Sequence, residues 1–221
     1  MFGPKIYPMG VKVVVFVKNN RRFFFFLFVF GYFCFLIQSI SMEKVTLKDK
    51  TFKKFISYEK ISAAIDEVAD KINADFEGCT DVPVLLCVLN GSIMFMGELM
   101  KRLSFNCQVI SIKLTSYEGT STTGRVKQAM GLTSSIEGRR VIVVEDIVDS
   151  GNTIVELKEI LKENGAAESY MCTLLLKPDA YKKDVKLDYV AMEIPNDFII
   201  GFGLDYDELG RNLKDIYTLD A

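Results

Sequence analysis

The chain has 221 residues, with 27 basic and 29 acidic side chains and no histidine. This length suits one domain, or one domain with an appendage. The lack of histidine excludes catalysis by a histidine base and metal sites built on histidine. The five cysteines lie far apart and form no CxxC pair, which argues against a zinc site and a disulfide framework. This cysteine usage fits a reducing compartment.

Residues 1–41 differ sharply in composition from the rest. They hold five basic residues, no acidic residue, ten of the seventeen phenylalanines, and an unbroken apolar run over 23–37. A membrane-spanning helix needs roughly 20 apolar residues, so this run is short. Three interpretations stay open: a signal peptide ending near Ser39 and Ser41, a membrane anchor, or an untranslated leader before a start at Met42. We favour the start at Met42.

Residues 42–221 carry 22 basic and 29 acidic side chains, a net charge of −7. Non-specific nucleic-acid binding depends on neutralising phosphates, so this acidic balance argues against a nucleic-acid partner. We therefore expect an apolar leader over 1–41 and one functional domain over 42–221, with no membrane contact by that domain.

Helix and strand patterns alternate along this domain. A helix is predicted after Ser57, with an apolar face at helical spacing made by Ile61, Ile65, Val68, Ile72 and Phe76. The later elements are a strand over 84–89, a helix over 93–103, strands over 109–114 and 141–144, a helix over 153–164, and strands over 171–176, 189–194 and 198–203. Residues 141–144 are all β-branched, as in a parallel strand covered on both faces. The alternation predicts an α/β fold with a mainly parallel sheet.

Residues 141–153 (VIVVEDIVDSGNT) carry the most informative pattern. A buried strand is predicted to end in Glu145 and Asp146, and ligands of open α/β sheets bind beyond the carboxyl ends of strands. Asp149 follows, and then a small polar loop over 150–153 at the start of a helix. Such a loop offers backbone N–H groups and hydroxyls to an anion. The segment therefore predicts acceptors for sugar hydroxyls or a metal beside a phosphate site, which suits a sugar phosphate.

The sequence VVEDIVDSGNT resembles the phosphoribosyl-pyrophosphate (PRPP) motif of type I phosphoribosyltransferases. Within that family the chain resembles the hypoxanthine-guanine phosphoribosyltransferases, through LNGSIMF at 89–95, SYEGTSTTG at 116–124, LLLK at 174–177 and EIPNDFIIGFGLDYDELGR at 193–211. The resemblance covers nearly all of residues 50–221. It implies the type I phosphoribosyltransferase fold: a twisted, mainly parallel sheet flanked by helices, with a small hood.

The resemblance implies roles for the residues of the PRPP motif. Glu145 and Asp146 would bind the ribose hydroxyls, directly or through Mg²⁺. Asp149 would face N7 of the purine as general base or acid, although its position also suits a helix N-cap. The 5′-phosphate would be held by Ser150, Gly151, Asn152 and Thr153.

The other segments would supply the pyrophosphate and metal contacts. Leu89, Asn90 and Gly91 would form the pyrophosphate loop, which in this family often has a non-proline cis peptide bond. Many relatives have lysine where Asn90 stands, so this chain lacks that cation. Arg211 would contact the pyrophosphate, and Asp205 would hold a Mg²⁺.

The resemblance also implies the purine contacts. Lys177 would contact the 6-oxygen, Phe198 would stack on the base, and the Ile199 backbone would meet its edge. Phe198 is equally compatible with a place in the core. Ser116 and Tyr117 would begin a mobile lid. Lysine only donates hydrogen bonds, so Lys177 satisfies a 6-oxo group but opposes a 6-amino group, which favours 6-oxopurines over adenine.

These roles predict a cytoplasmic, Mg²⁺-dependent enzyme of purine salvage. It would transfer the phosphoribosyl group from PRPP to hypoxanthine, guanine or xanthine, and it would form a homodimer or homotetramer, as the family commonly does. A regulator that keeps the PRPP fold and binds nucleic acid is the alternative, although the acidic domain does not favour it. An adenine or pyrimidine phosphoribosyltransferase is a third hypothesis, separated by base specificity alone.

Overall fold

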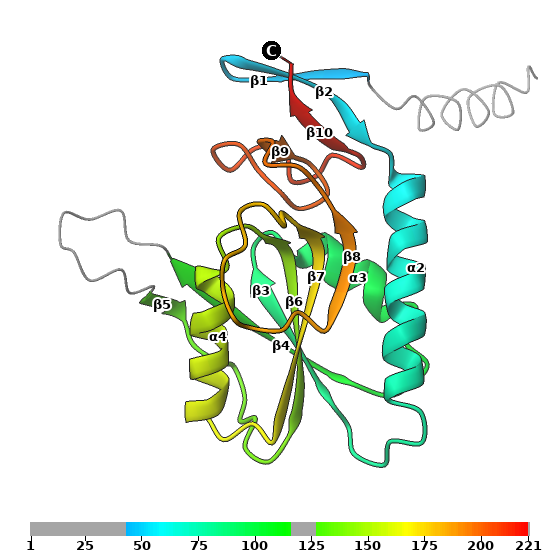
Figure 1. Ribbon diagram of the computed structural model, residues 1–221, viewed down its shortest axis with the longest axis vertical. Helices are drawn as coiled ribbons and strands as arrows, with labels where there is room; N and C mark the ends of the chain where they lie inside the picture. Colours follow the sequence, from blue (N-terminus) through cyan, green and yellow to red (C-terminus); the bar gives the residue numbers. More distant parts are fainter. Residues whose placement is uncertain (1–42, 116–126, 221) are drawn as a thin grey trace, which may run out of the picture. The chain divides into compact units, whose positions relative to one another are not determined.

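The computed structural model describes residues 43–115 and 127–220 and confirms the predicted α/β fold (Figure 1). The main sheet has six strands in the order β5-β4-β3-β6-β7-β8. Their bounds are Lys127–Met130 (β5), Gln108–Thr115 (β4), Val84–Leu89 (β3), Arg140–Val148 (β6), Glu168–Leu176 (β7) and Tyr189–Glu193 (β8). Five strands are parallel, and β5 joins the edge antiparallel to β4.

Helices cover both faces of this sheet (Figure 1). Their bounds are Tyr58–Asp75 (α2), Ile93–Met100 (α3) and Asn152–Glu163 (α4). Alternate residues of each strand point to opposite faces. Leu85 of β3 therefore packs with α2 and α3, while its neighbour Leu86 packs with α4. Two apolar cores result, and burial on both faces explains the continuous apolar runs of the central strands.

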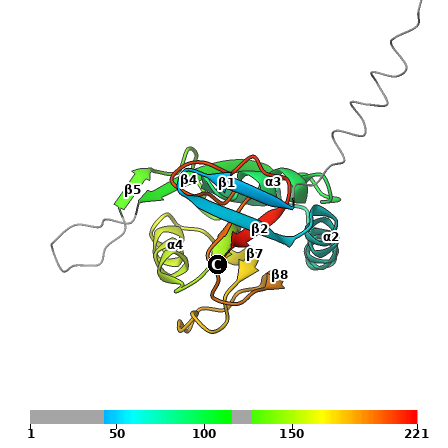
Figure 2. The same cartoon turned by 90° about the horizontal axis from the view of Figure 1, so that it is seen from above.

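A second, antiparallel sheet forms the hood, in the order β1-β2-β10-β9 (Figure 1). Figure 2 shows its strands β1 and β2 from above. Its strands are Lys44–Leu47 (β1), Lys50–Ile56 (β2), Ile199–Ile200 (β9) and Ile216–Leu219 (β10). A small core of Val45, Phe52, Ile200 and Tyr217 holds it together. The hood lies beyond the carboxyl ends of the main parallel strands (Figure 1), where ligands bind in such folds.

Two predicted strands differ in the structure. Strand β6 does not end at Glu145 and Asp146: its pairing with β3 stops at Val144, but its pairing with β7 continues to Val148. Beyond Val144, β6 is therefore hydrogen-bonded on the β7 side only. The strand predicted over 198–203 is reduced to the two residues of β9, because Gly201 at φ +97° turns the chain.

The predicted leader over 1–41 and the predicted lid residues Ser116 and Tyr117 lie outside the described residues. Among the helices of the described ranges, none is long and apolar enough to cross a membrane.

Candidate active site

Glu145, which is buried, and Asp146, which is half-buried, form a carboxyl pair on β6, beside the point where pairing with β3 stops. Glu145 is 8% exposed, and no donor among the described residues reaches its Oε2. Burial, reinforced by the charge of Asp146, raises the pKa of Glu145 well above its usual value. Asp146 Oδ1 accepts a hydrogen bond from the Ile147 N–H at 2.9 Å. A buried acceptor without a donor is costly. Glu145 Oε2 is therefore suited to accept a hydrogen bond from a hydroxyl group of a ligand.

Asp149 and Lys177 meet at the ends of two adjacent strands. The Lys177 N–H donates to the Val148 carbonyl at 2.9 Å, which extends the pairing of β6 with β7. The Lys177 ammonium lies 3.0 Å from Asp149 Oδ2, and the two side chains are 11% and 54% exposed. Asp149 is not the helix cap, because Gly151 occupies that position. One donor and one acceptor therefore stand side by side, which matches the adjacent O6 and N7 of a 6-oxopurine.

The polar loop before α4 is shaped around a glycine. Gly151 has φ +82°, and a Cβ at this position would lie 2.4 Å from the ring of Tyr181. Ser150 and Asn152 are exposed, and Thr153 is half-buried in the first turn of the helix. The first N–H groups of a helix have no acceptor within it, and the helix dipole favours an anion there. The loop is therefore suited to bind a phosphate.

The turn between β3 and α3 contains the cis peptide bond Leu89–Asn90, as the resemblance implied. Asn90 is exposed, whereas Gly91 is buried. A Cβ on Gly91 would lie 1.6 Å from Asp146 Oδ2, so any side chain at this position would displace that carboxyl group. The predicted pyrophosphate loop thus contacts the predicted ribose-binding residues directly.

Asp205 and Arg211 pair with each other in the loop between β9 and β10. Arg211 Nη2 lies 2.7 Å from Asp205 Oδ1, and Arg211 Nη1 donates to the Gly203 carbonyl at 2.8 Å. The described residues contain no cluster of three or more side chains that would hold a metal by itself. Mg²⁺ commonly takes one or two protein carboxylates together with substrate phosphates, so the single carboxylate of Asp205 fits a substrate-bound Mg²⁺.

Phe198 lies outside the core, 47% exposed, directly before β9. Its ring packs edge to face with Tyr206, 5.9 Å between centroids at 88°. Ile199 is buried, and its backbone pairs with Thr218 of β10. An exposed aromatic ring on a fixed backbone is suited to stack on a base. Sequence reasoning missed Tyr206, whose place beside Phe198 no local pattern signals.

Comparison with known proteins agrees with this geometry. The family model for the phosphoribosyl transferase domain matches residues 57–207. A hypoxanthine-guanine phosphoribosyltransferase of Streptococcus thermophilus is 39% identical over 173 residues, covering 77% of this chain and 95% of that protein.

Solved structures are similar as well. A hypoxanthine phosphoribosyltransferase of Staphylococcus aureus matches with a TM-score of 0.71 and 36% identity, covering 76% of this chain and 91% of that one. A hypoxanthine-guanine phosphoribosyltransferase of Bacillus anthracis matches with a TM-score of 0.71 and 37% identity, covering 79% and 100%. The predicted type I phosphoribosyltransferase fold is therefore confirmed. Sequence, fold and relatives agree, and this chain belongs to the phosphoribosyltransferase family.

Proposed function

We propose that this chain transfers the 5-phosphoribosyl group from PRPP to a 6-oxopurine, giving the nucleotide and pyrophosphate. Hypoxanthine and guanine are the expected bases, as in the names of the similar proteins, and xanthine carries the same 6-oxo group. The observation that carries the proposal is the contact of the Lys177 ammonium with the Asp149 carboxylate at 3.0 Å.

The base would enter with its O6 and N7 edge toward this pair. Lys177 would donate to O6, and Asp149 would take the proton from N7 as N9 attacks C1′ of the ribose. The C1′ bond to pyrophosphate breaks in the same displacement, through a cation-like sugar. Phe198 would stack on the purine, and the Ile199 backbone would meet its edge.

The other predicted residues would bind PRPP. Glu145 and Asp146 would accept hydrogen bonds from the ribose hydroxyls, which supplies the donor that Glu145 Oε2 lacks. The 5′-phosphate would be bound by Ser150, Gly151, Asn152 and Thr153. The pyrophosphate would be bound by Asn90, Gly91 and Arg211.

Mg²⁺ would be held by Asp205 and by the substrate, with Glu145 and Asp146 as further carboxylates near the ribose. Its chemistry there is to neutralise negative charge on the pyrophosphate as that group leaves. Arg211 keeps Asp205 oriented through their ion pair of 2.7 Å.

We further propose that residues 42–221 form the functional domain, that Ser116 and Tyr117 begin a lid that excludes water, and that the enzyme is a homodimer or homotetramer. PRPP is a cytoplasmic metabolite, so the proposed location is the cytoplasm.

A pyrophosphate-release assay with PRPP and Mg²⁺ tests the proposal. Hypoxanthine, guanine, xanthine, adenine and uracil are offered separately to the full chain. We expect release with one or more 6-oxopurines and little with adenine or uracil. A folded protein that binds PRPP but releases no pyrophosphate with any base would favour the regulator instead.

A further inference from the structure

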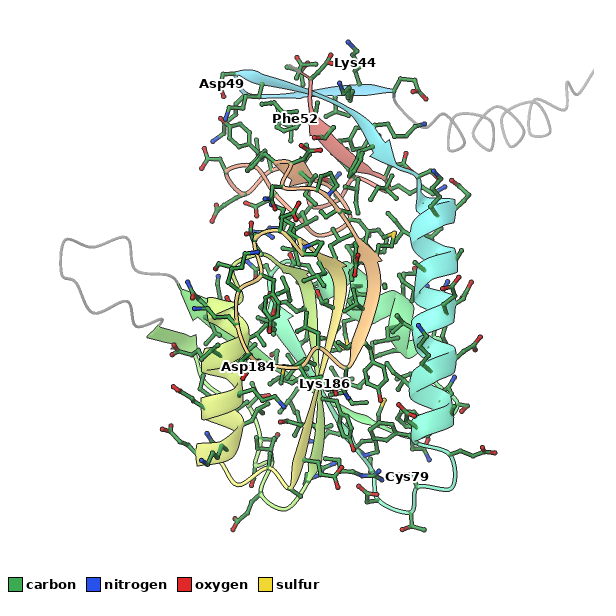
Figure 3. The ribbon with its side chains drawn as sticks, in the orientation of Figure 1. Lys44, Asp49, Phe52, Cys79, Asp184 and Lys186 are labelled. Carbon is green, nitrogen blue, oxygen red and sulfur yellow. The ribbon has the colours of Figure 1, made fainter. Side chains whose placement is uncertain are left out.

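The β1–β2 hairpin touches the segment that follows β9 through three successive residues: Lys48 and Asp49 in the turn and Lys50 at the start of β2. Lys48 forms an ion pair with Asp207. Asp49 Oδ1 accepts a hydrogen bond from the Tyr206 hydroxyl at 2.7 Å. The Lys50 ammonium lies 4.6 Å from the centroid of the Tyr206 ring. Figure 3 labels Asp49 on this hairpin, with Phe52 on the strand that follows. The hairpin therefore holds Tyr206 by its hydroxyl and by its ring.

Tyr206 in turn contacts the ring of Phe198. The rings of Tyr206 and Phe198 pack edge to face, and Phe52 of β2 packs against both. The centroid of the Phe52 ring lies 6.2 Å from that of Phe198 and 5.9 Å from that of Tyr206. The Lys50 ammonium is also 5.7 Å from the Phe198 centroid. Since Phe198 is half-exposed, these contacts from the hairpin and from Tyr206 orient its ring.

We infer that the hairpin residues Lys48, Asp49 and Lys50, together with Tyr206, form a clamp that positions Phe198 for stacking on the purine. Tyr206 and these three hairpin residues act through Phe198, so they are positioning residues. The inference deepens the proposed function and depends on it, because Phe198 is given a base to stack on only by that function.

The clamp is expected to affect base binding more than PRPP binding. Its contacts converge on the aromatic rings, whereas the proposed phosphate loop lies between β6 and α4. An edge-to-face pair also fixes the tilt of a ring, and aromatic stacking depends on that tilt. The hydrogen bond and the ion pair of the turn are solvent-exposed, so each contributes little to stability by itself.

Calorimetric titration of the full chain with guanosine 5′-monophosphate and with ribose 5-phosphate tests the clamp. The two ligands share the sugar phosphate, and only the nucleotide carries a base. We expect Tyr206→Leu to weaken nucleotide binding about 3- to 10-fold, the range for loss of one aromatic pair, and to leave ribose 5-phosphate binding unchanged. Tyr206→Phe keeps the ring and loses only the bond to Asp49, so its effect should be smaller. In turnover, Tyr206→Leu should raise KM for the base with little change in kcat.

Lys53→Met is the matched control for Lys50→Met. Both lysines lie on β2, but Lys53 pairs with Asp220 and makes no contact with the clamp among the described residues. Lys50→Met should weaken nucleotide binding, whereas Lys53→Met should not. Lys50→Met also replaces Tyr206→Leu as the deciding variant if thermal unfolding shows that the leucine variant does not fold.

The outcomes separate the two proposals. Equal loss of both ligands in the Tyr206→Leu and Lys50→Met variants, or no loss of either, overturns the clamp. A wild-type chain that binds the nucleotide no better than ribose 5-phosphate overturns the proposed function itself.

Discussion

Replacing Lys177 with methionine tests how the site recognises the 6-position of the base. The Lys177 side chain is only 11% exposed, so water cannot readily replace its ammonium group. Methionine keeps the unbranched side chain as far as its ε carbon and removes the donor. A hydrogen bond from a charged donor contributes about 1.5–3 kcal/mol. At one decade per 1.4 kcal/mol, kcat/KM for hypoxanthine should fall about 10- to 150-fold.

The same change should raise kcat/KM for adenine, because the Lys177 ammonium and the 6-amino group of adenine are both hydrogen-bond donors and would no longer face each other. The ratio of kcat/KM for hypoxanthine to that for adenine should therefore fall by at least about tenfold. Asp149 is 54% exposed, so its lost ion pair contributes about 0–1 kcal/mol to stability. Tm should then change by less than about 4 °C.

Initial rates with the two bases at saturating PRPP measure the ratio. The control is Lys182→Met, which removes an exposed lysine from the same loop. An unchanged ratio in a folded Lys177→Met variant would falsify the proposed contact with O6.

Three further predictions concern catalysis, burial and the leader. Asp149→Asn should lower kcat by about 10²- to 10⁴-fold, which is the usual contribution of an acid–base group. PRPP binding, measured by calorimetry, should stay near the wild-type value. Intact turnover with lost PRPP binding would contradict the acid–base role of Asp149. Burial raises the pKa of the Cys172 thiol, so the folded chain keeps a proton that the unfolded chain loses above about pH 8.5, and the free energy of unfolding should fall as pH rises through that value. Alkylation followed by mass spectrometry should modify Cys79 before Cys172, and the reverse order would refute the burial. A chain that starts at Met42 should keep the kcat and KM of the full chain, since every proposed site residue follows it; loss of activity on truncation would count against the leader hypothesis.

Elements with a strong burial pattern could be predicted from the sequence alone. The helical spacing of apolar residues predicted α2, and the unbroken apolar run predicted β3 with its observed bounds. Helix α2 is buried along one face and strand β3 on both faces, so the spacing of their apolar residues follows from how each element packs.

The resemblance implied the hood, but its strands β1, β2 and β10 could not be predicted from the sequence pattern, for physical reasons. Strand β2 has lysines on both of its faces, which obscures any alternation. Its turn has no glycine, yet Lys48 adopts φ +51°, so the usual hairpin signal is absent. Strand β10 pairs with β2 from the far end of the chain, and no local pattern reports such a pairing.

The candidate site was predicted by resemblance more than by periodicity. The contacts within it come from the topology: Asp149 and Lys177 meet because β6 and β7 are neighbours. The contact of Gly91 with Asp146 likewise depends on the adjacent strands β3 and β6. Tyr206 gave no signal, because its role depends on a hairpin distant in the sequence.

The most direct test of the proposed function is to identify the product. Full-length chain is incubated with PRPP, Mg²⁺ and labelled hypoxanthine or guanine, and the nucleotide and pyrophosphate are quantified together. We expect a purine nucleoside 5′-monophosphate and pyrophosphate in equal amounts, with almost no product from adenine. Hydrolysis of PRPP without nucleotide, or nucleotide formed equally well from adenine, would contradict it.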